Sequence, residues 1–213
     1  MDKKELLGTI ILPASKSISN RLLILNSIAD PPGKLVNLSA SDDTRVMKQA
    51  LISEEGNIDI GHAGTAMRFL TAFLSIQEGK YCLTGSERMK QRPIEKLVNA
   101  LNDLGAEIEY LEKRGYPPLS IQGKKISGGE ISVDSSVSSQ YISALMMIGP
   151  TLNKGLKINL EGDIVSSSYI HLTENLMHEL DIPVSFSGSR IDIPYHRFMG
   201  RDLLVEADWS AAS

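Results

Sequence analysis

Nine residues near the start of the sequence decide how it is interpreted: Pro13-Ala14-Ser15-Lys16-Ser17-Ile18-Ser19-Asn20-Arg21. They follow an apolar run typical of a strand, residues 9–12, and precede an apolar run typical of a helix, residues 22–28. The stretch holds three hydroxyls, an amide, a lysine and an arginine, and no carboxylate. Because the first N–H groups of a helix lack intrahelical partners and the helix dipole favours negative charge there, this arrangement favours an anion site. Taken alone, the same residues also fit an ordinary helix cap with two basic neighbours.

The composition is that of a globular protein. Of the 213 residues, 42% are hydrophobic and 23% are charged, enough for one large domain or two small ones. The formal net charge of -4 argues against a nucleic-acid or membrane-surface partner, so an anion would have to be bound by a local cluster of cations. The single cysteine, Cys82, excludes an intramolecular disulfide and a cysteine-rich metal site and fits a cytoplasmic setting. The apolar run at residues 10–12 is short, so we expect neither a signal peptide nor a transmembrane helix there.

Three consecutive units share one layout: turn, helix, strand, turn, helix, and two strands, with the first copy abbreviated. Helices are predicted at residues 21–29, 44–52, 66–76, 93–104, 141–148 and 169–180. Strands are predicted at residues 34–38, 57–60, 80–84, 107–112, 119–122, 156–160, 183–186 and 190–193. The strand at 57–60 closes the first unit in this layout, and Pro93 is placed in the first turn of its helix. If the units pack around a pseudo-threefold axis, their first helices all begin on one face.

Two glycine-rich or basic motifs suit an anion at that face. In Gly61-His62-Ala63-Gly64-Thr65-Ala66-Met67-Arg68, the glycine at 64 allows close approach of a ligand to the backbone. In Arg88-Met89-Lys90-Gln91-Arg92-Pro93, three cations precede a helix, and an arginine can bind phosphate or carboxylate bidentately. The first motif also fits a plain helix cap, with Arg68 in a salt bridge, and the second also fits a solvated basic loop.

Hydroxyl runs precede the helices of the third unit. Ser135, Ser136, Ser138 and Ser139 lead to Gln140, and the triplet at 166–168 leads to Tyr169. Several neutral donors at helix starts suit a phosphate group, and they equally suit capping and loop solubility. The four histidines have no metal-ligand spacing, so no metal site is expected.

Five motifs in this order resemble the 5-enolpyruvylshikimate-3-phosphate synthase family. They are Leu12-Pro13-Ala14-Ser15-Lys16-Ser17-Ile18-Ser19-Asn20-Arg21, Gly61-x-Ala63-Gly64-Thr65-Ala66-Met67-Arg68, Met89-Lys90-Gln91-Arg92-Pro93-Ile94, Ser138-Ser139-Gln140-Tyr141 and Ser166-x-x-Tyr169. The resemblance implies an α/β (α+β) fold in which each of two domains has three βαβαββ units around a pseudo-threefold axis. It further implies that residues 1–12 include a strand of the other domain, that 13–205 form one complete domain, and that 206–213 begin the crossover back.

The family transfers the enolpyruvyl group of phosphoenolpyruvate to the 5-hydroxyl of shikimate 3-phosphate and releases phosphate, on the shikimate pathway to chorismate and aromatic amino acids. The resemblance implies no metal or organic cofactor, these two small molecules as partners, no nucleic acid or membrane, a monomer, and a cytoplasmic location. The proposed general base belongs to the other domain. This chain alone is therefore expected to bind shikimate 3-phosphate without turnover.

The resemblance implies a set of residues for shikimate 3-phosphate. These are Lys16, Ser17, Arg21, Ser138, Ser139, Gln140, Ser166 and Tyr169. In that set, Ser17 and Arg21 hold the ring and its carboxylate, the serines of the third unit hold the phosphate, and Tyr169 lines the ring.

A second set is implied for phosphoenolpyruvate. Gly64 and Arg92 bind its phosphate, Gln140 bridges both substrates, and Lys16 contacts it and helps to move protons, which makes Lys16 the implied catalytic residue. His62 stands where the family usually has asparagine, so contacts to phosphoenolpyruvate, or to the inhibitor glyphosate, carry over less directly at that position.

Three other functions fit part of the sequence. The UDP-N-acetylglucosamine enolpyruvyl transferase has the same architecture, but it normally uses a loop cysteine, and Cys82 lies in a predicted strand. A non-catalytic module that binds shikimate 3-phosphate describes the chain by itself. An RNA-binding or RNA-end-processing protein with similar repeats is opposed by the acidic charge balance.

Overall fold

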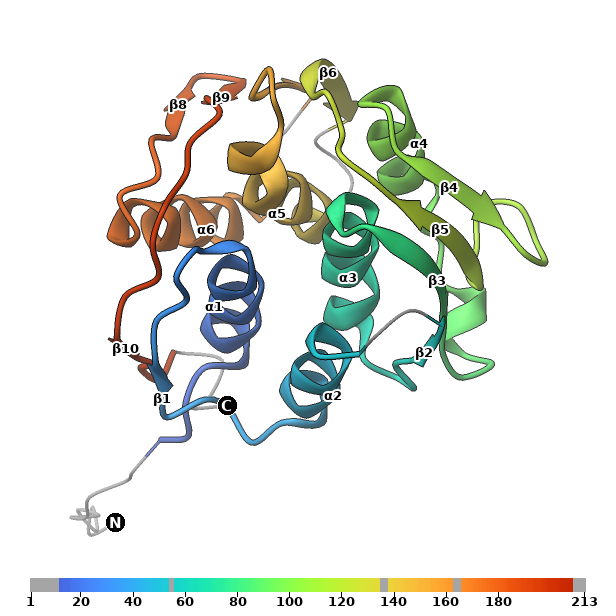
Figure 1. Cartoon of the computed structure of the whole chain (residues 1–213), viewed down its shortest axis with the longest axis horizontal. Coiled ribbons are helices and arrows are strands. Elements are labelled where there is room, and N and C mark those ends of the chain that lie inside the picture. Colours follow the sequence, from blue (N-terminus) through green and yellow to red (C-terminus); the bar gives the residue numbers. More distant parts are fainter. Residues whose placement is uncertain (1–11, 54–55, 135–137, 163–165, 209–213) are drawn as a thin grey trace, which may run out of the picture.

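The structure, a computed structural model, describes residues 12–53, 56–134, 138–162 and 166–208. Its elements form three units around a common centre (Figure 1). The second unit consists of β2 (Gly56–Asp59), α3 (Gly64–Ile76), β3 (Gly79–Thr84), α4 (Glu95–Asp103), β4 (Glu107–Tyr110) and β5 (Leu119–Gly123). The third unit consists of β6 (Gly129–Asp134), α5 (Ser139–Ile148), β7 (Leu156–Glu161), α6 (Ser167–Glu179), β8 (Ser185–Ser187) and β9 (Arg190–Ile193). Both sheets have the same strand order, β2-β3-β5-β4 and β6-β7-β9-β8, so the two units are copies of one βαβαββ topology.

The first unit is shorter, and a strand from far along the sequence completes it. It consists of α1 (Lys16–Ile28), β1 (Leu35–Val36) and α2 (Asp42–Leu51). The strand β10 (Leu203–Leu204) pairs in parallel with β1, just as β2 pairs with β3 and β6 with β7. The N–H of Leu203 donates to the carbonyl of Lys34 over 3.0 Å, which extends the pairing beyond the strands. The chain therefore closes the ring of units by returning to the first one.

The predicted fold of three βαβαββ-type units is confirmed, but the predicted boundary between units is wrong. The strand predicted at 57–60 as the end of the first unit is β2, and it pairs with β3 in the sheet of the second unit. The strand that begins the third unit, β6, was not predicted at all. Its pattern was available in the sequence, because buried Ile131 and Val133 alternate with exposed Glu130 and Ser132. Each full unit therefore begins with a strand that precedes the first helix. The strand predicted at residues 9–12 lies almost wholly outside the described residues.

The first helix of each unit begins earlier than predicted. The helix α1 begins at Lys16 rather than at residue 21, and α5 begins at Ser139 rather than at 141, because Ser15 and Ser138 are their N-caps. The stretches interpreted as turns therefore supply the first helical turns. The opposite error occurs at α4, where the N-cap is Ile94 and Pro93 lies outside the helix.

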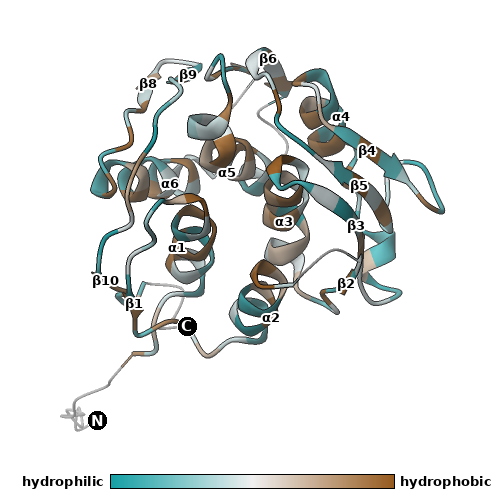
Figure 2. Ribbon diagram, viewed as in Figure 1, coloured by the Kyte–Doolittle hydropathy of each residue, from teal (hydrophilic) through white to brown (hydrophobic). Residues whose placement is uncertain are grey.

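The core lies where α1, α3 and α5 contact one another, with α2 packed against α1 and α3, and α6 packed against α5 and α1. The sheets lie on the outside of these helices (Figure 1), and much of the hydrophobic colouring lies on the helices (Figure 2). On the strands, buried residues alternate with more exposed ones, as in β6 and β7. Because α3 and α5 are covered on nearly all sides, they are mostly apolar around their whole circumference. Every residue of α5 is buried except Gln140, and in α3 the exceptions are Thr65 and Ile76. The exceptions at residues 65 and 140 both lie at helix starts.

We predict that truncation of the central helix destabilises the chain strongly. Leu70 on α3 is fully buried, so Leu70→Ala is expected to lower the free energy of unfolding by about 2–5 kcal/mol, measured by urea denaturation. Leu204 is 66% exposed, so Leu204→Ala is a matched control with an expected change within about 0.5 kcal/mol. Equal losses in the two variants would contradict the placement of the core.

Candidate functional site

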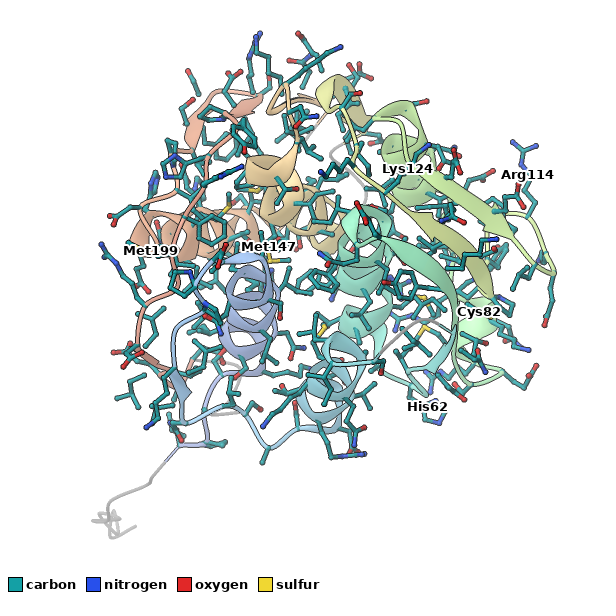
Figure 3. All side chains as sticks on the ribbon, viewed as in Figure 1. His62, Cys82, Arg114, Lys124, Met147 and Met199 are labelled. Atoms are coloured by element: carbon teal, nitrogen blue, oxygen red, sulfur yellow. The ribbon has the colours of Figure 1, made fainter. Side chains whose placement is uncertain are left out.

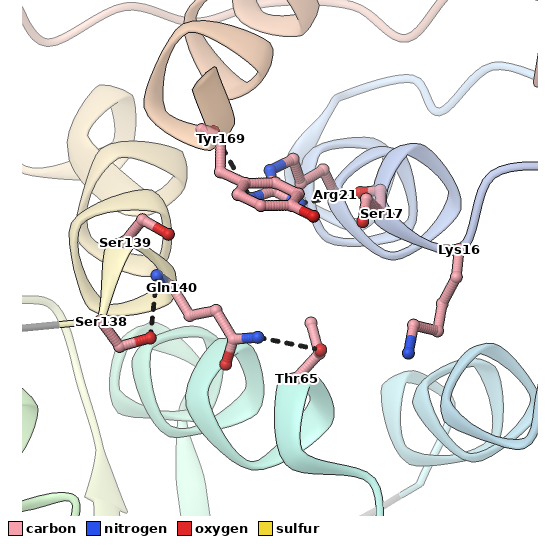
Figure 4. Close-up of a pocket in the computed structure, with 8 residues that line it drawn as sticks. All are labelled: Lys16, Ser17, Arg21, Thr65, Ser138, Ser139, Gln140 and Tyr169. Atoms are coloured by element: carbon pink, nitrogen blue, oxygen red, sulfur yellow. Dashed lines mark hydrogen bonds between the residues drawn. The ribbon is translucent and has the colours of Figure 1, made fainter. Parts of the chain in front are cut away.

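The starts of three central helices converge on one pocket (Figure 4). It has a volume of about 260 Å³ and is lined by Lys16, Ser17, Arg21, Thr65, Ser138, Ser139, Gln140 and Tyr169. These residues come from α1, α3, α5 and α6. The N-cap of α3, Ala63, offers no side-chain cap, so the first N–H groups of that helix are not satisfied by a capping side chain. The amide of Gln140 donates to the hydroxyl of Thr65 over 3.4 Å, which joins the starts of α5 and α3.

Arg21 is the buried cation of this pocket. Its side chain is 2% exposed, and it donates to the Thr173 hydroxyl over 2.7 Å, to the Ser143 hydroxyl over 3.1 Å and to the carbonyl of Ser17 over 2.9 Å. Its guanidinium also lies over the Tyr169 ring, 5.7 Å from the ring centre. Among the described residues, no carboxylate forms an ion pair with it.

The burial of Arg21 has a cost that an anion would offset. Desolvation lowers the pKa of Arg21 to about 10, and the effect of Tyr169 in the opposite direction is smaller. At neutral pH the group is charged in both the folded and the unfolded chain, so it adds no pH dependence to folding there. A buried cation held only by neutral acceptors is prepared for a negatively charged ligand.

A second cavity lies close to the first, because Gly64 lies against Arg92, which lines the second cavity, and the next residue, Thr65, lines the first. It has a volume of about 450 Å³ and is lined by His62, Arg88, Met89 and Arg92. The Arg92 guanidinium lies directly against Gly64, because a Cβ atom at position 64 would overlap its Nη1 atom and lie 2.9 Å from Cζ. Position 64 must therefore be glycine for this arginine to occupy its place, while its neighbour Thr65 lines the first pocket.

Arg68 fixes the loop that carries Arg92. It is 4% exposed and donates to the carbonyl of Gly64 over 3.2 Å and to the carbonyl of Pro93 over 3.2 Å. The hydroxyl of Tyr141 donates to the same Pro93 carbonyl over 2.6 Å. Burial is the main cause that lowers the pKa of Arg68, and the nearby Arg92 adds to the effect. The salt bridge considered for Arg68 does not occur among the described residues, and its partners are backbone carbonyls instead.

The structure brings together most of the residues predicted from the sequence. Seven line the first pocket: Lys16, Ser17, Arg21, Ser138, Ser139, Gln140 and Tyr169. Gly64, Arg92 and His62 lie at the adjoining cavity. Ser166 is exposed as the N-cap of α6 and lines neither cavity, while residues 163–165 before it are outside the described residues. Its role as a phosphate ligand stays a prediction.

Two further findings concern the described residues as a whole. They contain no group of three or more His, Cys, Asp or Glu side chains placed to hold a metal ion. No helix among them is both long enough and apolar enough to cross a membrane. The residues that line the two cavities offer cations, hydroxyls, an amide and helix starts.

The fold and the site define one domain of the enolpyruvyl transferase class, with three repeats and a cation-rich face. A family model described as EPSP synthase (3-phosphoshikimate 1-carboxyvinyltransferase) matches residues 1–53 and 48–213. The chain therefore belongs to the EPSP synthase family.

Relatives and solved structures agree with this assignment. The 3-phosphoshikimate 1-carboxyvinyltransferase of Bacteroides fragilis (strain YCH46) is 52% identical over 210 residues, which cover 97% of this chain and 50% of the relative. That of Vibrio campbellii is 39% identical over an alignment of 235 positions, gaps included, which covers 97% of this chain and 55% of the relative. The structure of EPSP synthase from Acinetobacter baumannii has a TM-score of 0.82 at 21% identity and covers 96% of this chain and 51% of that chain, which supports the fold. The chain spans about half the length of these relatives.

We predict that Gly64→Ala displaces Arg92 and weakens anion binding at the second cavity. The new Cβ atom would occupy the position of the guanidinium, so the affinity for inorganic phosphate is expected to fall about tenfold or more, measured by calorimetry. The double variant with Arg92→Ala is the control, because Gly64→Ala should add little once the arginine is gone. Additive losses would contradict displacement as the cause.

We predict that Arg21→Met does not destabilise the chain. The Ser143 and Thr173 hydroxyls bond each other over 2.8 Å and keep the carbonyl of Tyr169 as a partner, so they remain satisfied without the guanidinium. The free energy of unfolding is expected to stay within about 1 kcal/mol or to rise. Arg45→Met, at an exposed arginine paired with Asp42, is the control. A loss of about 3 kcal/mol or more in Arg21→Met alone would show that the hydrogen bonds outweigh the burial cost.

Proposed function

We propose that the protein of which this chain spans about half transfers the enolpyruvyl group of phosphoenolpyruvate to the 5-hydroxyl of shikimate 3-phosphate and releases phosphate. The observation that carries the proposal is the convergence of seven predicted substrate residues on one pocket, with three more at the adjoining cavity. Two adjoining cation-rich cavities suit two anionic substrates that must meet. Fixed cations and helix starts can orient both substrates and stabilise charge that develops during the reaction.

The shikimate 3-phosphate is assigned to the first pocket. The buried guanidinium of Arg21 pairs with its carboxylate, and the starts of α1 and α5 supply hydroxyl and backbone donors. Ser138 and Ser139 receive its phosphate, with Ser166 as a further phosphate ligand. The exposed Tyr169 ring covers the six-membered carbon ring of the substrate.

The phosphoenolpyruvate is assigned to the boundary between the two cavities. Arg92 and the start of α3 at Gly64 bind its phosphate, and Gln140 reaches both substrates. Lys16, whose side chain extends into the space beside α3 in Figure 4, contacts both substrates and moves protons.

The chain by itself is proposed to bind without turnover. Neither cavity has an aspartate or glutamate among the residues that line it, so the described residues offer no carboxylate base there.

The hydroxyl of Ser15 donates to Asp208, and the N–H of Ser15 donates to the carbonyl of Glu206, so the segments 13–15 and 206–208 lie side by side. This pairing supports a domain of residues 13–205 whose two ends lead to a second domain. Residues 1–11 and 209–213 lie outside the described residues. A monomeric state and a cytoplasmic location remain predictions from the sequence.

Calorimetric titration of this chain with shikimate 3-phosphate tests the assignment. We expect one binding site per chain, and we expect Arg21→Met, which keeps the fold, to weaken the affinity about tenfold or more because a charged hydrogen-bonded partner is lost. Arg45→Met should bind as the unaltered chain does. With both substrates present, a coupled assay should detect no release of phosphate, and turnover at the rate of a full-length relative would contradict the half-site proposal.

A further inference from the structure

The cavity lined by His62, Arg88, Met89 and Arg92 is bounded by two loops that are fastened to each other. The N–H of Ser86 donates to the carbonyl of Gly61 over 3.0 Å, and the N–H of Ile60 donates to the carbonyl of Thr84 over 3.0 Å. A Cβ atom at Gly85 would lie 2.7 Å from the Gly61 carbonyl oxygen, so the absence of a side chain allows this close approach. The contact fixes the position of one loop, which carries Ser86, relative to the other, which carries His62.

The Ser86 hydroxyl lies between the His62 ring and the short 3₁₀ helix Met89–Gln91. Its oxygen is 2.8 Å from the Nδ1 atom of His62, and it accepts the N–H of Met89 over 3.3 Å. The hydroxyl oxygen accepts this N–H with one of its lone pairs, and its own hydrogen can point to Nδ1. A neutral imidazole that accepts at Nδ1 carries its proton on Nε2.

We propose that Ser86 holds neutral His62 in the tautomer with the proton on Nε2, and that His62 thereby donates a hydrogen bond to the phosphate group of phosphoenolpyruvate beside Arg92. The inference rests on the proposed function, because it assigns this substrate to the cavity. His62 is a binding residue in this account, and Ser86 is a positioning residue that acts through it.

The chemistry of the cavity favours this tautomer. Nδ1 is occupied by Ser86, so Nε2 is the ring nitrogen left for a ligand in the cavity. The oxygens of an ionised phosphate group accept hydrogen bonds and do not donate them, so they need donors such as cations and N–H groups. The opposite tautomer would turn the lone pair of Nε2 toward those oxygens and repel them. A neutral donor next to Arg88 and Arg92 adds a hydrogen bond at a defined direction without adding a third full charge.

The chain contains an internal reference with the opposite expectation. The Nδ1 atom of His171 is 2.9 Å from the carboxylate of Glu174, which can only accept when it is ionised. His171 is therefore expected to carry a proton on Nδ1. One spectrum of one sample should show both assignments.

The tautomer is tested by long-range ¹H–¹⁵N spectra of the chain labelled at histidine, at about pH 8, above the ordinary imidazole pKa of about 6.5. His62→Asn assigns the signals of residue 62. We expect His62 to be protonated at Nε2, Ser86→Ala to show a mixture of tautomers, and Ser86→Thr, which keeps the hydroxyl, to restore the single form. A Nδ1–H form or a mixture in the unaltered chain, or an unchanged spectrum in Ser86→Ala, would overturn the proposal.

Titration of the same sample with phosphoenolpyruvate tests the donor role. We expect the His62 signals to shift, and we expect Ser86→Ala to weaken the affinity about threefold to tenfold while Ser86→Thr stays within about twofold. The affinity for shikimate 3-phosphate should be equal in all three chains. His62 signals that do not move at saturating phosphoenolpyruvate would overturn the donor role. Loss of shikimate 3-phosphate binding would instead count against the proposed function, and the substrate-free tautomer would still be read independently.

Discussion

The buried guanidinium of Arg21 is the feature on which the anion site of this structure depends. It belongs to the first unit, it lies 5.3 Å from the centre of the Phe69 ring in the second, and it donates to the Ser143 and Thr173 hydroxyls in the third. One side chain therefore contacts all three repeats at their common centre. The cost of burying that charge is met by neutral oxygens and aromatic faces, which leaves its charge available to a ligand at the converging helix starts.

The same constraint explains how an acidic chain presents a cationic site. The net charge is -4, yet the residues lining the two cavities include no carboxylate. Several acidic side chains are paired with cations elsewhere, for example Lys96 with Asp134 over 2.6 Å and Lys90 with Glu112 over 3.0 Å. These pairs are partly exposed and contribute little stability, but they place negative charge outside the helix starts. The electrostatic field at the site is thus positive although the net charge of the chain is negative.

Sequence reasoning located most of the site because short motifs, each local in the sequence, resemble those of one family. The hydroxyl-rich stretches before the apolar runs also indicated helix starts with free donors, although α1 and α5 begin earlier than predicted, after the N-caps Ser15 and Ser138. It failed where long-range pairing decides. The strands β1 and β10 are two residues each and exist only because they pair across most of the chain, and β2 follows the first unit in sequence but pairs forward. The role of Arg68 could not be predicted either, because it donates to the carbonyls of Gly64 and Pro93, whose positions depend on the folded loop.

A titration of the ¹⁵N-labelled chain with shikimate 3-phosphate, followed by backbone amide shifts, tests the central claim most directly. If three helix starts form one anion site around Arg21, the amides of Ser17, Thr65 and Gln140 should shift together with one dissociation constant. The amides of Ile52 and Leu204, on the exposed surface, should not move. Shifts confined to one helix start, or different constants at the three, would contradict the account.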